Sequence, residues 1–162
     1  MWNSSGYEKA EIIEQLKDYI DIYLVDLKYM NNDIAFKYSK ANNYVENATK
    51  TIIQMRKNQP QDIIENGLMK KGVIVRHLIL PNNTNDSLKC LEFIANNLGA
   101  NTIVSLMSQY EPRYNAKNYE EINRKITPLE YKRVVNYALK LQMKNCYTQD
   151  LSSADSKYTP EF

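Results

Sequence analysis

Residues 72–80 read GVIVRHLIL, an apolar run in which only Arg76 and His77 are polar. β-Branched residues dominate its first half and favour a strand. Pro81-Asn82-Asn83 follows directly, and a proline next to asparagines is a turn signal that ends the run. The stretch is the clearest strand of the chain, and the rest of the fold is built around it.

Strand-like and helix-like segments alternate on both sides of this run. Further strands are predicted at residues 21–28 (DIYLVDLK) and 102–109 (TIVSLMSQ), with a short closing strand at 145–149. Helical spacing of apolar residues predicts helices at 8–19, 44–57, 86–98 and 127–142. The polar stretch around Pro60 and Gly67 is predicted as a loop or short hairpin. Such alternation is typical of an α/β fold with a parallel sheet.

Two helix starts carry capping signals. In Thr127-Pro128-Leu129-Glu130, threonine can cap, proline suits the first helical position, and glutamate can reach back to the cap amide. Asp86 or Ser87 can cap the helix before it, and Gly99 can end that helix.

The number of strong strands limits the architecture. Three parallel strands cannot close a barrel, and a complete (β/α)8 barrel usually takes about 250 residues. No Gly-rich phosphate loop follows any strand, so an ordinary dinucleotide-binding fold is not indicated. The length fits one domain spanning residues 1–162. The strand at Asp21–Lys28 is expected to leave an open edge that invites pairing with another chain.

Composition excludes several classes of protein. Lys plus Arg number 21 and Asp plus Glu 19, and this net charge of +2 without a like-charged block does not indicate nucleic-acid binding. No apolar run approaches the ~18 residues of a membrane span, and no signal-peptide pattern is present, which predicts a soluble, cytoplasmic protein. Cys90 and Cys146 are far apart. They predict no disulfide framework, and an iron-sulfur cluster needs at least three neighbouring thiolates.

Polar residues at the strand ends are the candidate site, because ligands gather at the carboxyl ends of parallel strands. Alternation places Asp26 and Lys28 on one face, where they either form a solvated ion pair or contact a ligand. Arg76 interrupts an apolar run. Its guanidinium either pairs with Asp26 or makes bidentate hydrogen bonds to a ligand carboxylate. His77 points to the opposite face and is interpreted as a hydrogen-bonded packing residue. Ser105, Met107 and Gln109 share one face of the third strand, a surface suited to an adenine or a sulfonium.

Together these motifs resemble the radical S-adenosylmethionine (SAM) enzymes that activate glycyl radical enzymes, notably pyruvate formate-lyase activating enzyme and proteins related to it. The resemblance covers nearly the whole chain, in order and with compatible spacing. Its motifs are Trp2-Asn3-Ser4-Ser5-Gly6-Tyr7, residues 20–29 (IDIYLVDLKY), residues 72–81 (GVIVRHLILP) and residues 105–112 (SLMSQYEP).

This resemblance implies a partial TIM-type barrel, the C-terminal (β/α)3 half of a six-stranded radical SAM barrel with an open sheet edge. It also implies an oxidoreductase whose [4Fe-4S] cluster cleaves SAM to a 5′-deoxyadenosyl radical for hydrogen abstraction, with a glycyl radical enzyme as partner. Carried over position by position, the resemblance implies SAM contacts at Asn3, Ser5, Gly6, Asp26, Lys28, Arg76, and Gln109 or Tyr110. The last pair falls where activating enzymes often place a histidine.

The motifs that hold the iron-sulfur cluster and the SAM amino group are not found in this sequence. We therefore expect a truncated SAM-binding half with no catalytic or metal-binding residue of its own, which binds SAM weakly and is inactive alone. One alternative is a non-catalytic half-barrel that forms a homodimer through its strand edge or binds a protein partner. Another is a small SAM- or nucleotide-binding enzyme without a cluster. Residues 111–126, rich in Tyr, Asn and Lys, are either a partner contact or a solvated connection.

Overall fold

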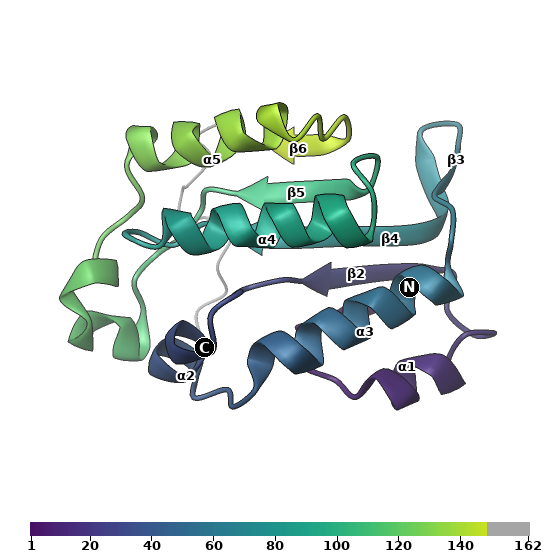
Figure 1. Cartoon of the computed structure of the whole chain (residues 1–162), viewed down its shortest axis with the longest axis horizontal. Coiled ribbons are helices and arrows are strands. Elements are labelled where there is room, and N and C mark those ends of the chain that lie inside the picture. The colour runs from purple at the N-terminus through teal and green to yellow at the C-terminus, as the bar shows by residue number, and fades with distance from the viewer. Residues whose placement is uncertain (149–162) are drawn as a thin grey trace.

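The computed structural model describes residues 1–148 and shows an α/β fold around one sheet (Figure 1). The strands at the centre and edges of the sheet are parallel, as predicted, and one antiparallel strand pairs with the beginning of β4. The parallel strands lie in the order β1 (Trp2–Ser4), β2 (Ile22–Asp26), β4 (Leu68–Leu78), β5 (Ile103–Met107) and β6 (Cys146–Thr148).

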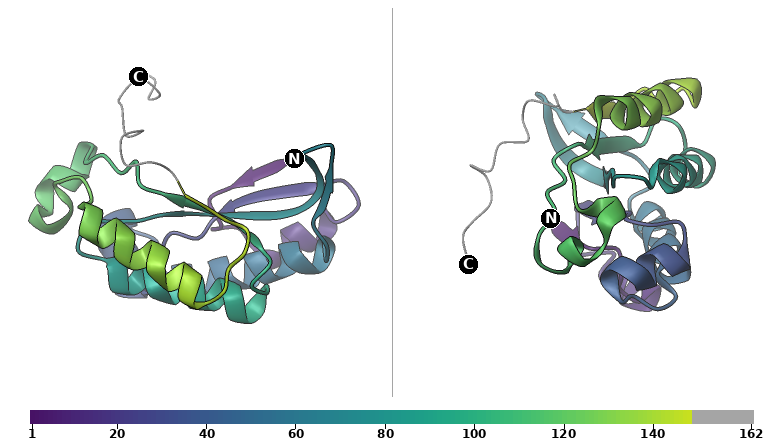
Figure 2. Two further views of the ribbon diagram at one scale, coloured as in Figure 1. Left: turned by 90° about the horizontal axis from the view of Figure 1, so that it is seen from above. Right: turned by 90° about the vertical axis from the view of Figure 1, so that its left-hand side faces the viewer.

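The α-helices pack against a single face of this sheet, which Figure 2 shows edge-on. They are α1 (Ala10–Gln15), α2 (Asn32–Ser39), α3 (Tyr44–Asn58), α4 (Thr84–Asn97) and α5 (Pro128–Lys140). Two short 3-10 helices, η1 (Tyr114–Asn118) and η2 (Glu120–Ile122), follow β5. Within residues 1–148, no helix covers the opposite face. None of the helices in this range has the length and apolar character needed to cross a membrane.

The strand register separates two kinds of residue. Val25, Val75 and Val104 are neighbours across the sheet, point to the helices and are fully buried. The next row, Asp26, Arg76 and Ser105, points to the other side and is half-buried. We call this second surface the helix-free face; it carries Asn3, Leu24, Asp26, Ile74, Arg76, Leu78, Ser105 and Met107. Burial of the helix-side row supplies the hydrophobic stabilisation of the sheet.

The open edge of the sheet lies one strand further out than the sequence predicts. Trp2, Asn3 and Ser4 pair in register with Tyr23, Leu24 and Val25, so β1 and not β2 is the edge. The expectation of an edge at Asp21–Lys28 was wrong because a segment of three residues is too short to show a strand period. β6 forms at residues 146–148 as predicted, and Gln149 lies outside the described residues.

The polar stretch before β4 forms a hairpin, which is one of the two predicted outcomes. β3 (Ile63–Glu65) pairs antiparallel with the first part of β4. Asn66 and Gly67 connect them with φ of 52° and 78°. Positive φ at both positions is typical of the tight hairpin turn that Asn-Gly favours.

Helix starts were partly predictable. Thr127 and Glu130 form the predicted capping box at the start of α5. Neither Asp86 nor Ser87 caps α4: Asn83 is the N-cap residue, and the buried Asp86 carboxylate accepts the amide of Met30 instead. The first helix was predicted at residues 8–19 but spans only Ala10–Gln15. α2 was missed, although Asn31 caps it by accepting the amides of Asp33 and Ile34.

Candidate functional site

Four side chains from three neighbouring strands meet at the carboxyl end of the helix-free face. Asp26 Oδ1 accepts Arg76 Nε at 2.7 Å, and Asn3 Oδ1 accepts Arg76 Nη2 at 2.8 Å. Lys28 Nζ lies 3.4 Å from Asp26 Oδ2. We call Asn3, Asp26, Lys28 and Arg76 the strand-end quartet. The predicted ion pair between Asp26 and Arg76 therefore forms, within a larger group whose donors remain half-exposed.

Pairing of β1 with β2 brings Asn3 to this place, and a tight turn follows directly after β1. Gly6 has a φ of +80°, and a Cβ atom there would lie 2.5 Å from the carbonyl oxygen of Asp26. Only glycine allows this approach, because the φ is unfavourable for other residues and a side chain would collide with the backbone of β2. Ser4 Oγ accepts the Gly6 amide at 2.8 Å and donates to Glu8. The turn is thus held against the end of β2.

Tyr44, at the start of α3, fastens the end of β2 from the helix side. Its hydroxyl accepts the backbone amide of Lys28 at 2.9 Å and lies 3.4 Å from the carbonyl oxygen of Asp26. Burial raises the pKa of Tyr44 above its ordinary value, so the hydroxyl keeps its proton. The ring contacts those of Tyr7 and Tyr29. Tyr44 therefore fixes the backbone from which Lys28 projects.

A cavity of about 250 Å³ adjoins the quartet. Polar Asp26, Lys28 and Ser39 line it together with an apolar and aromatic wall that consists of Tyr29, Leu78, Leu80, Met107 and Tyr110. Cavities with apolar walls and a few converging polar groups are typical ligand sites. We call this space the strand-end cavity.

Tyr110, and not Gln109, faces this space. Tyr110 is 9% exposed and lines the strand-end cavity, whereas Gln109 is exposed and lines none of the cavities described here. Tyr110 Oη is buried and has no hydrogen-bond partner among the described residues. A buried hydroxyl without a partner is costly unless a ligand or water satisfies it.

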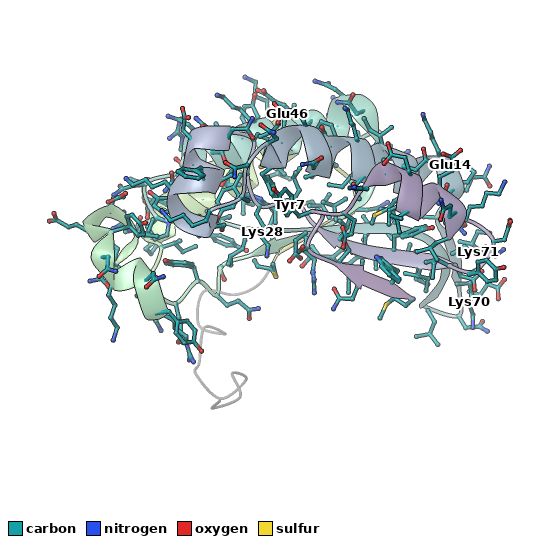
Figure 3. All side chains as sticks on the ribbon, turned by 90° about the horizontal axis from the view of Figure 1, so that it is seen from below. Tyr7, Glu14, Lys28, Glu46, Lys70 and Lys71 are labelled. Carbon is teal, nitrogen blue, oxygen red and sulfur yellow. The ribbon has the colours of Figure 1, made fainter. Side chains whose placement is uncertain are left out.

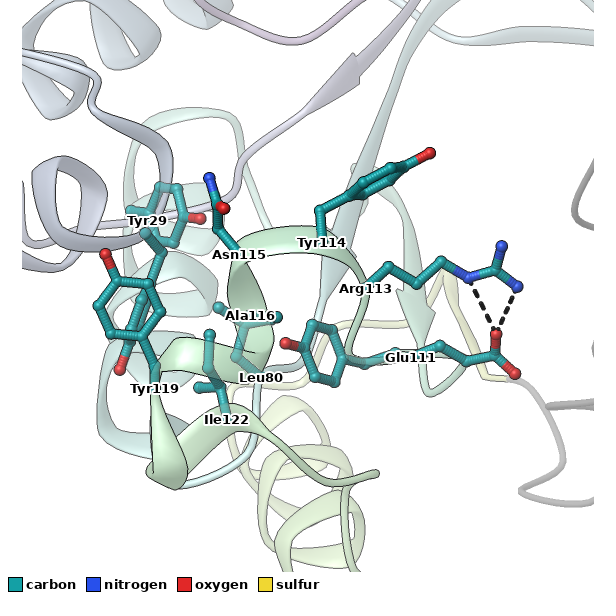
Figure 4. Close-up of a pocket in the computed structure, with 11 residues that line it drawn as sticks. Tyr29, Leu80, Glu111, Arg113, Tyr114, Asn115, Ala116, Tyr119 and Ile122 are labelled. Carbon is teal, nitrogen blue, oxygen red and sulfur yellow. Dashed lines mark hydrogen bonds and ion pairs between the residues drawn. The ribbon is translucent and has the colours of Figure 1, made fainter. Parts of the chain in front are cut away.

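A second cavity of about 330 Å³ lies beyond Tyr110, and Figure 4 shows its walls. Tyr29 and Tyr119 stand on one side of it, and the ion pair of Arg113 with Glu111 on the other. Tyr119 donates to the carbonyl oxygen of Lys37, and Glu121 pairs with Lys37 and Tyr38. Residues 111–126 are thus fastened to α2 over this cavity, and nothing among the described residues tests a partner contact there.

His77 lies on the helix side of the sheet, opposite Arg76. It is 1% exposed, and its Nδ1 is 2.7 Å from the carbonyl oxygen of Leu27. Burial lowers the pKa of His77, so the ring is neutral, with Nδ1–H donating to Leu27. This geometry agrees with the interpretation of His77 as a packing residue.

The described residues do not fit an iron-sulfur cluster. Cys90 is buried in α4 and Cys146 lies in β6. Among residues 1–148, no group of three or more His, Cys, Asp or Glu side chains is placed to hold a metal ion. A cluster needs several neighbouring thiolates, so no chemical step through it is derived for this chain.

The same residues fit part of a SAM molecule better. Lys28 and Arg76 offer cationic donors for a carboxylate, and Asp26 offers an acceptor for a hydroxyl. Met107 and Leu78 provide polarizable and apolar surface beside them. Ser5 is exposed above the turn and lines a neighbouring pocket rather than the strand-end cavity. These residues can contact only one side of a SAM molecule.

Comparison with known proteins agrees with this fold. The structure matches a domain of pyruvate-formate lyase-activating enzyme from Bacteroides vulgatus with a TM-score of 0.62. The match covers 90% of this chain and 78% of that domain at 13% sequence identity, so it shows the fold alone. The fold prediction is therefore confirmed as an α/β arrangement like a partial barrel.

An uncharacterised protein of Methanocaldococcus jannaschii is 36% identical over 151 residues, which is 91% of this chain. The aligned segment is 40% of that protein, so the chain spans about two fifths of the length of this relative. No protein-family model matches the chain.

Sequence reasoning missed several residues around the strand-end cavity. Tyr29, Ser39 and Tyr44 come from the end of β2, the end of α2 and the start of α3, and each lines a cavity or holds the quartet. The signal for Ser39 was absent because α2 itself was not predicted. Tyr29 could have been found, since it directly follows Asp26-Leu27-Lys28 at the end of a strand.

Proposed function

We propose that this chain is the SAM-binding, C-terminal part of a radical SAM enzyme of the type that activates glycyl radical enzymes. The observation that carries the proposal is the strand-end quartet. It places Asp26, Lys28 and Arg76 together on the helix-free face, in a fold that matches a domain of such an enzyme. The order of the motifs along the chain supports the same conclusion.

In this proposal each quartet residue has a defined role. Arg76 and Lys28 bind the carboxylate of SAM, because a cationic fork and an ammonium both favour that group. Asp26 accepts a ribose hydroxyl while it holds the Arg76 side chain in place. Asn3, Ser5 and Gly6 form the turn beside the ligand, and Tyr110 donates its unpaired hydroxyl to the adenosine part.

The proposed reaction needs an electron from a [4Fe-4S] cluster, for which the described residues offer no set of thiolates. We propose that another polypeptide segment holds the cluster, in agreement with the greater length of the archaeal relative. The chain alone should then bind SAM weakly and catalyse nothing.

The first experiment is to sequence the coding region immediately upstream of the Met1 codon. An in-frame segment with three clustered cysteines supports the proposal, and a stop codon followed by a genuine start site contradicts it. The extended protein is then reconstituted anaerobically with iron and sulfide, and 5′-deoxyadenosine is measured. We expect Arg76→Lys to weaken SAM binding about tenfold or more, because the planar fork is lost while the charge is kept.

Lys70→Arg is a matched control, since it makes the reverse exchange of the same two cationic side chains at the opposite end of β4. An equal loss in Lys70→Arg would mean that the effect is not specific to the quartet. Cleavage of SAM by residues 1–162 alone after reconstitution would contradict the predicted inactivity of the chain.

A further inference from the structure

A third pocket, of about 210 Å³, lies at the carboxyl ends of β1 and β2 on the side of α2. Figure 3 shows two of its side chains, Tyr7 and Lys28, next to each other. The residues with polar side chains that line it come from the turn after β1, the segment after β2, the end of α2 and the start of α3: Ser5, Tyr7, Lys28, Tyr29, Ser39, Lys40 and Tyr44. We call it the Tyr7 pocket. It shares Lys28, Tyr29 and Ser39 with the strand-end cavity.

The charged residues that line the Tyr7 pocket are all positive. The lining contains two lysines and no Asp or Glu. The nearest carboxylate, that of Asp26, already holds Arg76 at 2.7 Å and lies 3.4 Å from Lys28 Nζ. An ammonium has three donors, so Lys28 retains donors for a ligand. Lys40 Nζ makes a long contact of 3.5 Å to the carbonyl oxygen of Lys37 and lies 5.3 Å from the centre of the Phe36 ring.

Hydroxyl groups complete the donor set. Tyr29 Oη and Ser39 Oγ are 2.8 Å apart. Burial raises the pKa of Tyr29, so its phenol stays protonated and can donate to Ser39. The hydrogen of Ser39 is then free to point into the pocket. Ser5 Oγ makes no hydrogen bond with other described residues, although the Ser5 carbonyl oxygen is near Tyr44 Oη.

We propose that the Tyr7 pocket binds the phosphate group of a small molecule. Two ammonium groups balance the double charge of a phosphate monoester, and the serine hydroxyls can donate to its remaining oxygens. A flat carboxylate needs fewer donors and carries only half the charge. The site goes beyond the proposed function, because Tyr7 and Lys40 belong neither to the quartet nor to the lining of the strand-end cavity, although Lys28 and Ser5 also belong to the proposed SAM contacts.

The test is a titration of residues 1–162 with inorganic phosphate, followed by phosphorus NMR, at an ionic strength held constant with sodium chloride. Constant ionic strength is needed because exposed charges are screened by salt. We expect saturable binding that acetate does not reproduce. Acetate binding as tight as phosphate binding, or a linear phosphate response, would overturn the proposal. No SAM, iron or sulfide is present, so the result is independent of the proposed function.

Variants locate the site. Lys40 has a φ of 55°, a conformation that asparagine tolerates, so Lys40→Asn removes the ammonium with little backbone strain. We expect it to weaken phosphate binding about tenfold, the effect of one charge-assisted hydrogen bond. Ser39→Ala should weaken binding by roughly fivefold, the effect of one neutral hydrogen bond.

Lys70→Ala is the charge-matched control and should leave phosphate binding unchanged, because Lys70 is at the far end of the sheet (Figure 3). Melting temperatures without phosphate check that each variant is folded. Equal weakening by Lys40→Asn and Lys70→Ala, or unchanged binding in folded Lys40→Asn, would show that the pocket is not the site.

Discussion

Arg76 and His77 are neighbours in sequence and have opposite environments. Arg76 lies on the helix-free face with Asp26 and Asn3, whereas His77 is buried on the helix side, with its Nδ1 hydrogen-bonded to the carbonyl oxygen of Leu27. Strand alternation alone predicts this separation. It does not predict which face is open, because that depends on where the connecting helices pack.

His77 should make folding stability depend on pH. Its pKa is lowered in the folded chain, so the unfolded chain binds a proton first as the pH falls through about 6.5. Stability is therefore complete above that pH and declines below it, by at most about 1.4 kcal/mol per pH unit. Urea unfolding at pH 7.5, 6.5 and 5.5 measures the slope.

His77→Gln is the informative variant, because the glutamine amide can still donate to Leu27 and does not titrate. We expect the decline of its unfolding free energy from about pH 7.5 to 5.5 to disappear. Glu121 and Glu130, with lowered pKa values, matter only below the ordinary range of a carboxyl group, and Asp86, whose pKa burial raises, adds stability as the pH falls. A slope that persists in His77→Gln would assign the dependence to other groups.

The site was predictable where it lies on long strands. Asp26, Lys28 and Arg76 were identified from polar breaks in apolar runs, and the structure brings them together. Asn3 came only from the family resemblance. Gln109 points elsewhere because β5 ends at Met107, and the alternation that grouped it with Met107 stops there.

At the scale of elements, the central strands followed their composition, whereas β1 and α2 did not. β4 and β5 are long enough for β-branched residues to mark them, whereas β1 owes its three residues of pairing to β2. α2 is held by Asn31 and by contacts with residues 119–121, which are distant in sequence. Contacts with residues that are distant in sequence leave no helical pattern in the local sequence.

β2 provides a direct test of the one-sided sheet. Val25 is fully buried against the helices, whereas Leu24 is half-buried on the helix-free face. We expect Val25→Ala to lower the unfolding free energy by about 2.5 kcal/mol and Leu24→Ala by about 1 kcal/mol, although leucine loses more carbon atoms. Urea unfolding compares the two. An equal or larger cost for Leu24→Ala would mean that the second face is also covered.

At the scale of the whole molecule, the sheet formed by residues 1–148 has helices on one side, and no other strand in this range pairs with the outer edge of β1. Exposed edges and apolar faces favour association with another polypeptide. We expect residues 1–162 to self-associate as their concentration rises, whether or not a glycyl radical enzyme is a partner. A homodimer without SAM binding would favour the non-catalytic half-barrel.

Sedimentation velocity over a wide concentration range measures this association. Leu24→Lys places a charge on the helix-free face and should shift the chain toward monomer. Tyr19→Lys is the control, because Tyr19 is 79% exposed in the connection after α1. Equal effects of both substitutions would argue against the helix-free face as the contact.

The contact of Asn3 with Arg76 joins the edge strand to the rest of the strand-end quartet. Asn3 lies in the edge strand, and its Oδ1 accepts from a guanidinium proposed to bind ligand. A polypeptide that pairs with β1 and moves Asn3 would release one arm of Arg76 or hold it more firmly. Pairing at β1 and ligand binding are then linked equilibria. The bound ligand changes the affinity for the pairing polypeptide by the same factor by which that polypeptide changes the affinity for the ligand.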